Sequence, residues 1–118
     1  SDGRLWIDVR RDALIGTGGE NVRPAAVEDV LRAHPAVADA GVCGLLDNHW
    51  GQRVAASFVL RSWAHCDEAE LGAWCRDRLA PFQVPRAWRL VAALPRTLSG
   101  KLQRQRLAAS WGEVVHGG

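Results

Sequence analysis

The sequence predicts an α+β fold: a small mixed or antiparallel sheet of three strands plus a short two-stranded hairpin, covered by about three helices. Three observations lead to this expectation. Short alternating or β-branched apolar runs recur along the chain, other segments repeat apolar residues at helical spacing, and Gly or Pro separates most of them. The length of 118 residues suits one domain, which we expect to span 1–118.

The first two strands are expected near the start of the chain. Leu5, Ile7 and Val9 alternate as in a strand, and residues 13–15 begin a second short strand. The first strand follows Asp2-Gly3, a hairpin-turn dipeptide with almost no chain before it. Because a hairpin turn needs a strand on both sides, we infer that the chain is a piece of a longer polypeptide.

The first helix should begin at Pro24 and end near Pro35. Proline favours the first position of a helix because its fixed φ is already helical. Val27, Val30 and Leu31 then fall on one apolar face, at the spacing that a helix buries. Pro35 ends the helix, since the residue before a proline avoids the helical conformation.

The second half of the chain repeats the pattern of strands followed by a helix. Strands at 37–46 and 53–60 flank a turn at 47–51 and should pair as a hairpin. A capping box, Asp67-x-x-Glu70, begins the second helix, which stops before Pro81. The remaining elements are a strand at 88–92, a helix at 102–111 and a tail that we place at 108–118.

Composition narrows the possible classes of function. Apolar residues make up 47% of the chain and charged residues 24%, and no apolar run approaches the roughly 20 residues of a membrane span. The net charge of +2 comes from arginines scattered among acids and gives no reason to expect nucleic acid. The three cysteines lack C-x-x-C spacing, so they predict neither a disulfide framework nor a zinc site. A reducing, cytoplasmic setting fits best.

The chain has one lysine, Lys101, and every other fixed cation is an arginine. A lysine delivers a compact ammonium on a flexible stem, which suits a mobile positive charge brought to an anion. The plain alternative is a coding bias that replaced most lysines by arginine and left this one. Pro95 and Gly100 bracket the residue in a loop, where no helical pattern explains it.

Two glycine-containing loops could bind phosphate or nucleic acid. Ser99-Gly100-Lys101 resembles the end of a P-loop, but Pro95 and Leu102 stand where that motif needs Gly and Ser or Thr, so we reject it. The stretch 16–19 satisfies the G-x-x-G of a KH module for RNA. A strand rather than a helix precedes it and its flanks are not basic enough, which disfavours that alternative.

Taken together, the motifs resemble the C-terminal domain of the adenylate-forming superfamily, which includes acyl- and aryl-CoA ligases, adenylation domains of peptide synthetases, and luciferases. The resemblance covers residues 2–107. It rests on three strings: Arg10-Arg11-Asp12, then Gly18-Gly19-Glu20-Asn21-Val22-Arg23-Pro24 leading into Val27-Glu28, then Pro95-Arg96-Thr97 with Gly100-Lys101 and Arg104.

The resemblance implies a lid that rotates between two poses, one for each half-reaction. Lys101 matches the catalytic lysine that enters the active site as acyl-adenylate and pyrophosphate form. Asp12 matches the hinge, at the end of a hairpin over 1–12, and Arg10 matches an arginine that approaches the nucleotide ribose. In the second pose the loop Gly18-Gly19-Glu20-Asn21 lines the channel for the pantetheine thiol of coenzyme A.

The chain departs from the family pattern at three places. Val9, Ala13 and Ala26 stand where the family usually has a glycine, an acidic hinge residue and a glutamate. None of these changes removes a group to which the resemblance assigns catalysis. They make the hinge and the first helix less typical.

Other residues carry weaker signals. The turn at 49–53 faces the second-pose interface or coenzyme A in similar ligases, and Arg86 and Arg89 could pair with a CoA phosphate, although a solvated face explains them as well. The side chains most simply placed in the core are four tryptophans: Trp6, Trp63, Trp74 and Trp88.

The resemblance therefore implies part of an ATP-dependent acid–thiol ligase that makes an acyl-adenylate and then an acyl-CoA. Three strings, Arg10-Arg11-Asp12, Gly18-Gly19-Glu20-Asn21-Val22 and Trp50-Gly51-Gln52-Arg53-Val54, look most like those of medium-sized acyl- or aryl-CoA ligases, such as the o-succinylbenzoate-CoA ligases of menaquinone synthesis. A large N-terminal domain of the same chain would bind ATP with Mg and the carboxylic acid, with coenzyme A as co-substrate, so the isolated piece should be inactive. Two alternatives stay open: an adenylation domain that loads a carrier protein, and a non-catalytic interaction module with the same fold.

Overall fold

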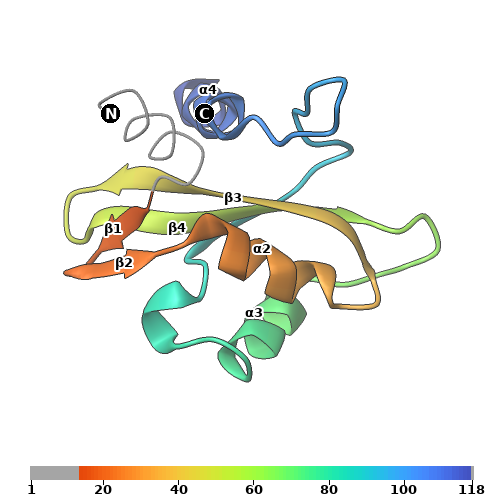
Figure 1. Cartoon of the computed structure of the whole chain (residues 1–118), viewed down its shortest axis with the longest axis horizontal. Helices are drawn as coiled ribbons and strands as arrows, with labels where there is room; N and C mark the ends of the chain where they lie inside the picture. Colours follow the sequence, from red (N-terminus) through yellow and green to blue (C-terminus); the bar gives the residue numbers. More distant parts are fainter. Residues whose placement is uncertain (1–13, 118) are drawn as a thin grey trace, which may run out of the picture.

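Figure 1 shows the computed structural model of the chain, which describes residues 14–117, with side chains for 14–111. A single sheet of five strands forms its centre. The strands are β1 Ile15–Thr17, β2 Glu20–Val22, β3 Val37–Asp47, β4 Gly51–Leu60 and β5 Ala87–Leu90. The α+β class that the sequence predicts is confirmed.

The long hairpin of β3 and β4 is the frame of the sheet. These strands pair antiparallel from Val37–Leu60 to Asp47–Gly51, with a register irregularity between Val37 and Asp39. The other edge of β4 takes two partners: β1 joins it antiparallel at Thr17–Gly51, and β5 runs parallel to it from Ala55–Ala87 onward. The sequence predicted no strand at Glu20–Val22; this segment forms β2, and its hairpin with β1 extends the same sheet.

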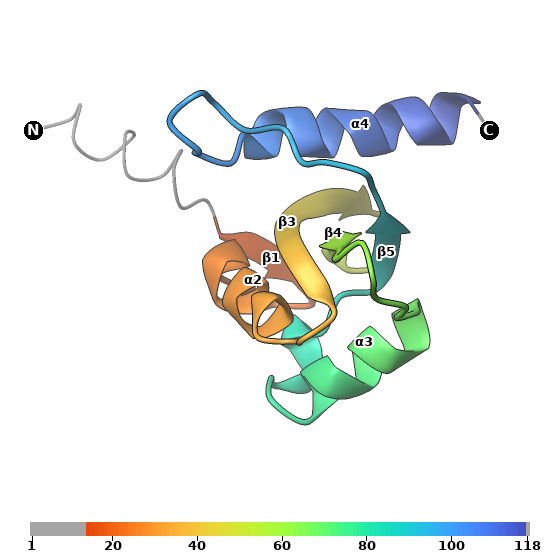
Figure 2. The same ribbon diagram turned by 90° about the vertical axis from the view of Figure 1, so that its right-hand side faces the viewer.

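Helices cover both faces of the sheet (Figures 1 and 2). The described helices are α2 Pro24–Arg32, α3 Glu68–Arg76, the short 3-10 turn η1 Pro81–Gln83, and α4 Arg104–Gly117. On one face, α2 and α3 bury Val27, Leu31 and Leu71 against Val42 and Phe58 of the sheet. On the opposite face, Leu107 and Trp111 of α4 pack on Cys43 and Ala55.

The helix signals in the sequence are confirmed in position. Pro24 is the first residue of α2, and the carboxylate of Asp67 caps α3 by accepting a hydrogen bond from the Glu70 amide at 2.8 Å. Helix α3 ends at Arg76, before Leu79, because the chain turns there toward the 3-10 segment at Pro81.

The boundaries of several elements differ from expectation, most of them by a few residues. The second strand begins at Ile15 rather than at residue 13. Helix α4 starts at Arg104 and continues to Gly117, so most of the segment 108–118 that we expected to be a tail is helical. Leu107 and Trp111 lie one turn apart and both pack on the sheet, which ties the helix down beyond its first turns. Among the described helices, none has the length and hydropathy of a membrane span.

Candidate functional site

Lys101 lies in a tight loop between β5 and α4, which we call the Lys101 loop and define as residues 95–103. Arg96 and Leu102 form an antiparallel bridge across its base. Inside it, the amide of Thr97 donates to the Lys101 carbonyl at 2.9 Å, and the amide of Lys101 donates to Thr97 Oγ1 at 3.0 Å. Gly100 has φ of 92°, a left-handed conformation that suits glycine and lets the chain reverse.

The side chain of Lys101 is exposed at the rim of this loop. Within residues 14–111, its ammonium takes part in none of the ion pairs or hydrogen bonds that the structure forms. Leu98, at the tip of the same loop, is fully exposed. The loop thus presents a cation and an apolar side chain away from the domain.

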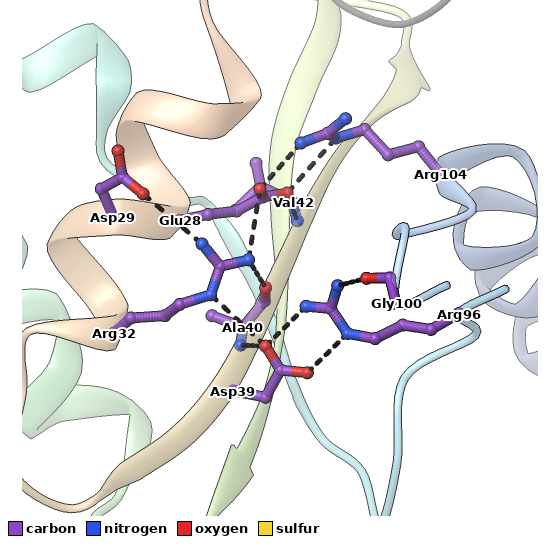
Figure 3. A network of polar contacts seen from close by, with 9 residues as sticks. All are labelled: Glu28, Asp29, Arg32, Asp39, Ala40, Val42, Arg96, Gly100 and Arg104. Carbon is purple, nitrogen blue, oxygen red and sulfur yellow. Dashed lines mark hydrogen bonds and ion pairs between the residues drawn. The ribbon is translucent and has the colours of Figure 1, made fainter. Parts of the chain in front are cut away.

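Arg96 holds the beginning of the loop against the sheet (Figure 3). Its guanidinium donates to both oxygens of Asp39 on β3, at 2.9 and 2.7 Å, and to the Gly100 carbonyl at 2.7 Å. Burial raises the pKa of Asp39, but the hydrogen bonds from Arg96 and from the Ala40 amide outweigh it, so the pKa lies below the ordinary 3.8. Asp39 is therefore an ionised anchor at neutral pH.

Glu28 holds the end of the loop from α2 (Figure 3). Arg104, the first residue of α4, donates to its two carboxylate oxygens at 3.2 and 2.7 Å. The Val42 amide donates to the same carboxylate at 2.9 Å, and Arg32 lies 3.6 Å away. Only 2% of Glu28 is exposed, so this carboxylate depends on its partners to offset the cost of burial.

The second glycine-containing loop is the turn between β1 and β2, here called the Gly18–Gly19 turn. Both glycines have positive φ, 57° and 86°, as the tight two-residue hairpin requires. The Gly18 amide donates to the Trp50 carbonyl at 2.9 Å. A Cβ on Gly18 would lie 2.8 Å from the Trp50 ring, whereas a Cβ on Gly19 would meet no atom within 4 Å.

The turn at 47–51, which joins β3 to β4, contacts the Gly18–Gly19 turn and supports it. Hydrogen bonds from the Trp50 and His49 amides hold the pKa of Asp47 below its ordinary value. The guanidinium of Arg86 stacks on the Trp50 ring, 4.2 Å from its centre. Gln52 accepts a hydrogen bond from the Gly16 amide at 2.9 Å, so the segment braces β1 as well.

The two loops lie at opposite ends of the β3–β4 hairpin. The Lys101 loop is anchored at Asp39, near the start of β3, and the Gly18–Gly19 turn contacts the residues that follow Asp47, where β3 ends. A rise of about 3.3 Å per residue puts these two positions roughly 26 Å apart along the strand. In Figure 1 the β1–β2 turn lies at the left end of the sheet, and the blue loop that precedes α4 lies above its right-hand half.

The described residues that the sequence motifs indicated lie in separate parts of the fold. Lys101 and Gly18 occupy separate exposed loops, while Glu20 and Asn21 are exposed on β2. Arg10 and Asp12 lie outside the described residues.

Sequence reasoning assigned no role to the anchors of the Lys101 loop. Arg96 and Arg104 flank Lys101 in the motif, which was the available signal. Their carboxylate partners Asp39 and Glu28 are 57 and 76 residues distant in sequence, and only the folded sheet brings them close.

Arg86 and Arg89, the two arginines that could pair with a CoA phosphate, differ in how their guanidinium groups are held. Arg89 is held by α4, because it donates to Ser110 O and Oγ at 3.2 and 3.0 Å. Arg86 lines an open pocket of about 530 Å³ together with Arg76, Leu79, Pro81, Val84 and Pro85. Of the two, Arg86 is the better placed to meet a ligand.

The expectation for the tryptophans is confirmed in part. Trp88 packs against the core, and Trp74 Nε1 donates to the Val30 carbonyl at 2.8 Å. The core placement of Trp63 is wrong, since 70% of the residue is exposed in the connection that follows β4. Trp6 lies outside the described residues.

The cysteines are free, and burial raises the pKa of Cys43 and Cys75 to about 11. One group in the described residues could surround a metal: His34, Cys66 and Glu70 place donor atoms within 4.8 Å of one another. However, His34 Nδ1 accepts a hydrogen bond from the Ala36 amide at 3.0 Å, so the neutral ring carries its proton on Nε2, which faces Cys66. Burial also raises the pKa of the Cys66 thiol. This arrangement suits a local hydrogen bond better than a metal site.

Comparison with families of known proteins gives a match over most of the chain. A model of the AMP-binding enzyme C-terminal domain matches residues 26–101, which is more than half of the chain. The chain belongs to this family. The match begins in α2 and ends at Lys101, so it contains both carboxylates that anchor the Lys101 loop.

Relatives of the domain carry one recurring name. The 2-succinylbenzoate–CoA ligase of Bacillus licheniformis is 48% identical over 106 residues, which are 90% of this chain and 22% of that protein. The o-succinylbenzoate CoA synthetase of Bacillus subtilis, solved with a product analogue, is 45% identical with a TM-score of 0.77, over 83% of this chain and 20% of that one. The same synthetase solved with its acyl-adenylate intermediate gives 45% identity and a TM-score of 0.76, over 80% and 19%. The domain thus spans about a fifth of the length of these relatives.

Proposed function

We propose that this chain is the C-terminal lid domain of an ATP-dependent acid–thiol ligase, which forms an acyl-adenylate and then an acyl-CoA thioester. Its similarity to CoA ligases over 90% of its length supports this reaction class. A larger N-terminal domain would bind ATP and the acid, since the chain spans 22% of such a relative. The names of the relatives further support 2-succinylbenzoate as the acid and a place in menaquinone synthesis.

The observation that carries the proposal is the separation of the two loops on the sheet. The Lys101 loop is anchored at Asp39 and the Gly18–Gly19 turn contacts the residues after Asp47, positions roughly 26 Å apart along β3. They cannot both reach one active site in a single pose. A domain that rotates as a rigid lid would present one loop for adenylation and the other for thioester formation.

In the adenylation pose, Lys101 would lie between the carboxylate and the α-phosphate. Two anions that must approach each other repel, and a cation between them offsets that repulsion. A unit charge about 4 Å away in a partly dry site contributes on the order of 4 kcal/mol. Residues 95–103 contain no carboxylate. Since Mg²⁺ in nucleotide sites is held by phosphates, waters and one or two carboxylates, we assign the ATP-bound Mg²⁺ to the larger domain.

In the second pose, the Gly18–Gly19 turn would line the channel for the pantetheine thiol. The absence of side chains at these two positions leaves room for a narrow channel, and Glu20 and Asn21 continue it on β2. Trp50 and Arg86 lie next to this turn and would face coenzyme A. Asp12 as hinge and Arg10 near the ribose remain part of the proposal on their motif alone.

The test uses the ligase that carries this chain, expressed at full length. Lys101→Ala should slow ATP–pyrophosphate exchange, which reports adenylation, by roughly a thousandfold. Thioester formation from supplied acyl-adenylate should stay at the wild-type rate. Arg106→Ala is the matched control, because it removes an exposed cation from α4 close in sequence. Equal damage to both half-reactions by Lys101→Ala would contradict the proposal.

A further inference from the structure

One side chain of the Lys101 loop, Arg96, ties the turn before Lys101 to the sheet. Residues 97–101 hydrogen-bond to one another, and a Cβ on Gly100 would meet no atom within 4 Å. Packing therefore does little to hold the turn just before Lys101. The Arg96 guanidinium reaches across the loop to the Gly100 carbonyl at 2.7 Å and binds Asp39 with its other two donors (Figure 3).

Asp39 lies at a special position in β3. The register of β3 against β4 shifts between Val37 and Asp39, as at a β-bulge. Bulges redirect a side chain and recur beside functional sites. The carboxylate also accepts hydrogen bonds from the Ala40 amide at 2.9 Å and from Arg32 Nε at 3.3 Å, which fix its orientation. These two contacts orient the Asp39 carboxylate independently of Arg96.

We propose that Asp39 and Arg96 are positioning residues for adenylation. Asp39 fixes the planar fork of Arg96, and Arg96 fixes the carbonyl of Gly100, the residue that precedes Lys101. The ammonium then starts from one backbone direction instead of many, so less conformational freedom is lost when it enters the active site. This inference rests on the proposed function and names residues outside the reacting centre.

The fork geometry is the part that a simple charge cannot replace. Arg96 uses Nε and Nη2 for the two oxygens of Asp39 and Nη1 for Gly100, so all three donors act at once. A lysine ammonium could keep the charge beside Asp39, but it could not span the carboxylate and the carbonyl in this way. Arg96→Lys thus separates the ion pair from the positioning of the loop.

The experiment measures both half-reactions in the full-length ligase. For adenylation, Asp39→Asn and Arg96→Lys should each lower kcat by about tenfold to a hundredfold and leave KM for ATP and acid unchanged, because the substrates bind to the larger domain. Thioester formation from supplied acyl-adenylate should be unaffected. The double variant should lose no more than the worse single variant, since both residues act through one contact. Asp29→Asn is the control, because it removes an exposed carboxylate that also pairs with Arg32 but does not touch the loop.

The outcomes test the positioning role of Asp39 and Arg96 separately from the proposed function. Equal loss in both half-reactions, or adenylation at the wild-type rate, would overturn the positioning role of Asp39 and Arg96. If Asp39→Asn does not fold, Arg96→Lys alone gives the decision. Lys101→Ala is measured beside them: selective loss there with normal rates in Asp39→Asn and Arg96→Lys overturns this inference alone. An unimpaired Lys101→Ala overturns the proposed function as well.

Discussion

The Lys101 loop and the Gly18–Gly19 turn are both short, exposed and dependent on glycine, yet different forces hold them. Ion pairs from two carboxylates, Asp39 and Glu28, anchor the Lys101 loop at its two ends. The Gly18–Gly19 turn is held by a backbone hydrogen bond and by the ring of Trp50. Charged anchors leave the Lys101 side chain free to project, whereas close packing keeps the glycine turn narrow. Each support suits the role that we propose for its loop.

Of the predicted changes in stability, the largest should come from Glu28→Ala, which removes one anchor of the Lys101 loop. The change leaves the Val42 amide without its acceptor, and Arg104 and Arg32 without the buried carboxylate. Removing one partner of a buried ion pair is costly, so the free energy of unfolding should fall by about 3 kcal/mol. Urea denaturation of the chain measures this. Asp29→Ala, on the same helix but exposed, should cost at most about 0.5 kcal/mol. If Glu28→Ala lowers the free energy of unfolding by no more than Asp29→Ala does, ion pairs do not hold the Lys101 loop.

A smaller effect should come from Gly18→Ala compared with Gly19→Ala. Both substitutions place a Cβ at positive φ, which costs about 1–2 kcal/mol. Gly18→Ala must in addition displace the Trp50 ring, 2.8 Å from the new Cβ, and should therefore destabilise the chain by about 1 kcal/mol more. Thermal unfolding of the two variants gives the difference directly. Equal destabilisation would mean that Trp50 does not fix the turn.

The smallest effect is the dependence of stability on pH that Asp39 contributes. Its pKa in the folded chain lies below 3.8, so the ionised carboxylate stabilises the fold above that value. This contribution is lost as the pH falls from about 3.8 through the lower folded pKa. Asp39→Asn should show a shallower loss of stability than the wild type in that range, measured by urea denaturation at a series of pH values. Parallel curves would show that the Arg96 contact does not favour the ionised form. The effect is small because both side chains are partly exposed.

Local signals in the sequence predicted the elements better than their partners. The helix starts at Pro24 and Asp67 are confirmed because a fixed φ and a capping carboxylate act within one turn of chain. The parallel pairing of β5 with β4, and the joining of β1 to the same sheet, depend on contacts between distant segments. A pattern of alternation cannot specify which edge a strand will find.

The candidate site divides in the same way. The sequence singled out Lys101 and the glycines, whose residue types already limit what they can do. It assigned no role to Asp39 or to Glu28, although Glu28 belongs to one of the strings, because a carboxylate becomes an anchor only when folding removes it from water and brings an arginine to it. Trp63 shows the converse error: an aromatic residue favours the core, but its place in a connection leaves it exposed.

The central claim is that the two loops serve different half-reactions, and the most direct test measures Lys101→Ala and Gly18→Ala side by side in the full-length ligase. Adenylation is followed by ATP–pyrophosphate exchange, and thioester formation is followed from supplied acyl-adenylate. We predict that Lys101→Ala abolishes most of the first rate and spares the second, while Gly18→Ala slows the second and spares the first. Two variants that each slow both half-reactions to the same extent would contradict the account.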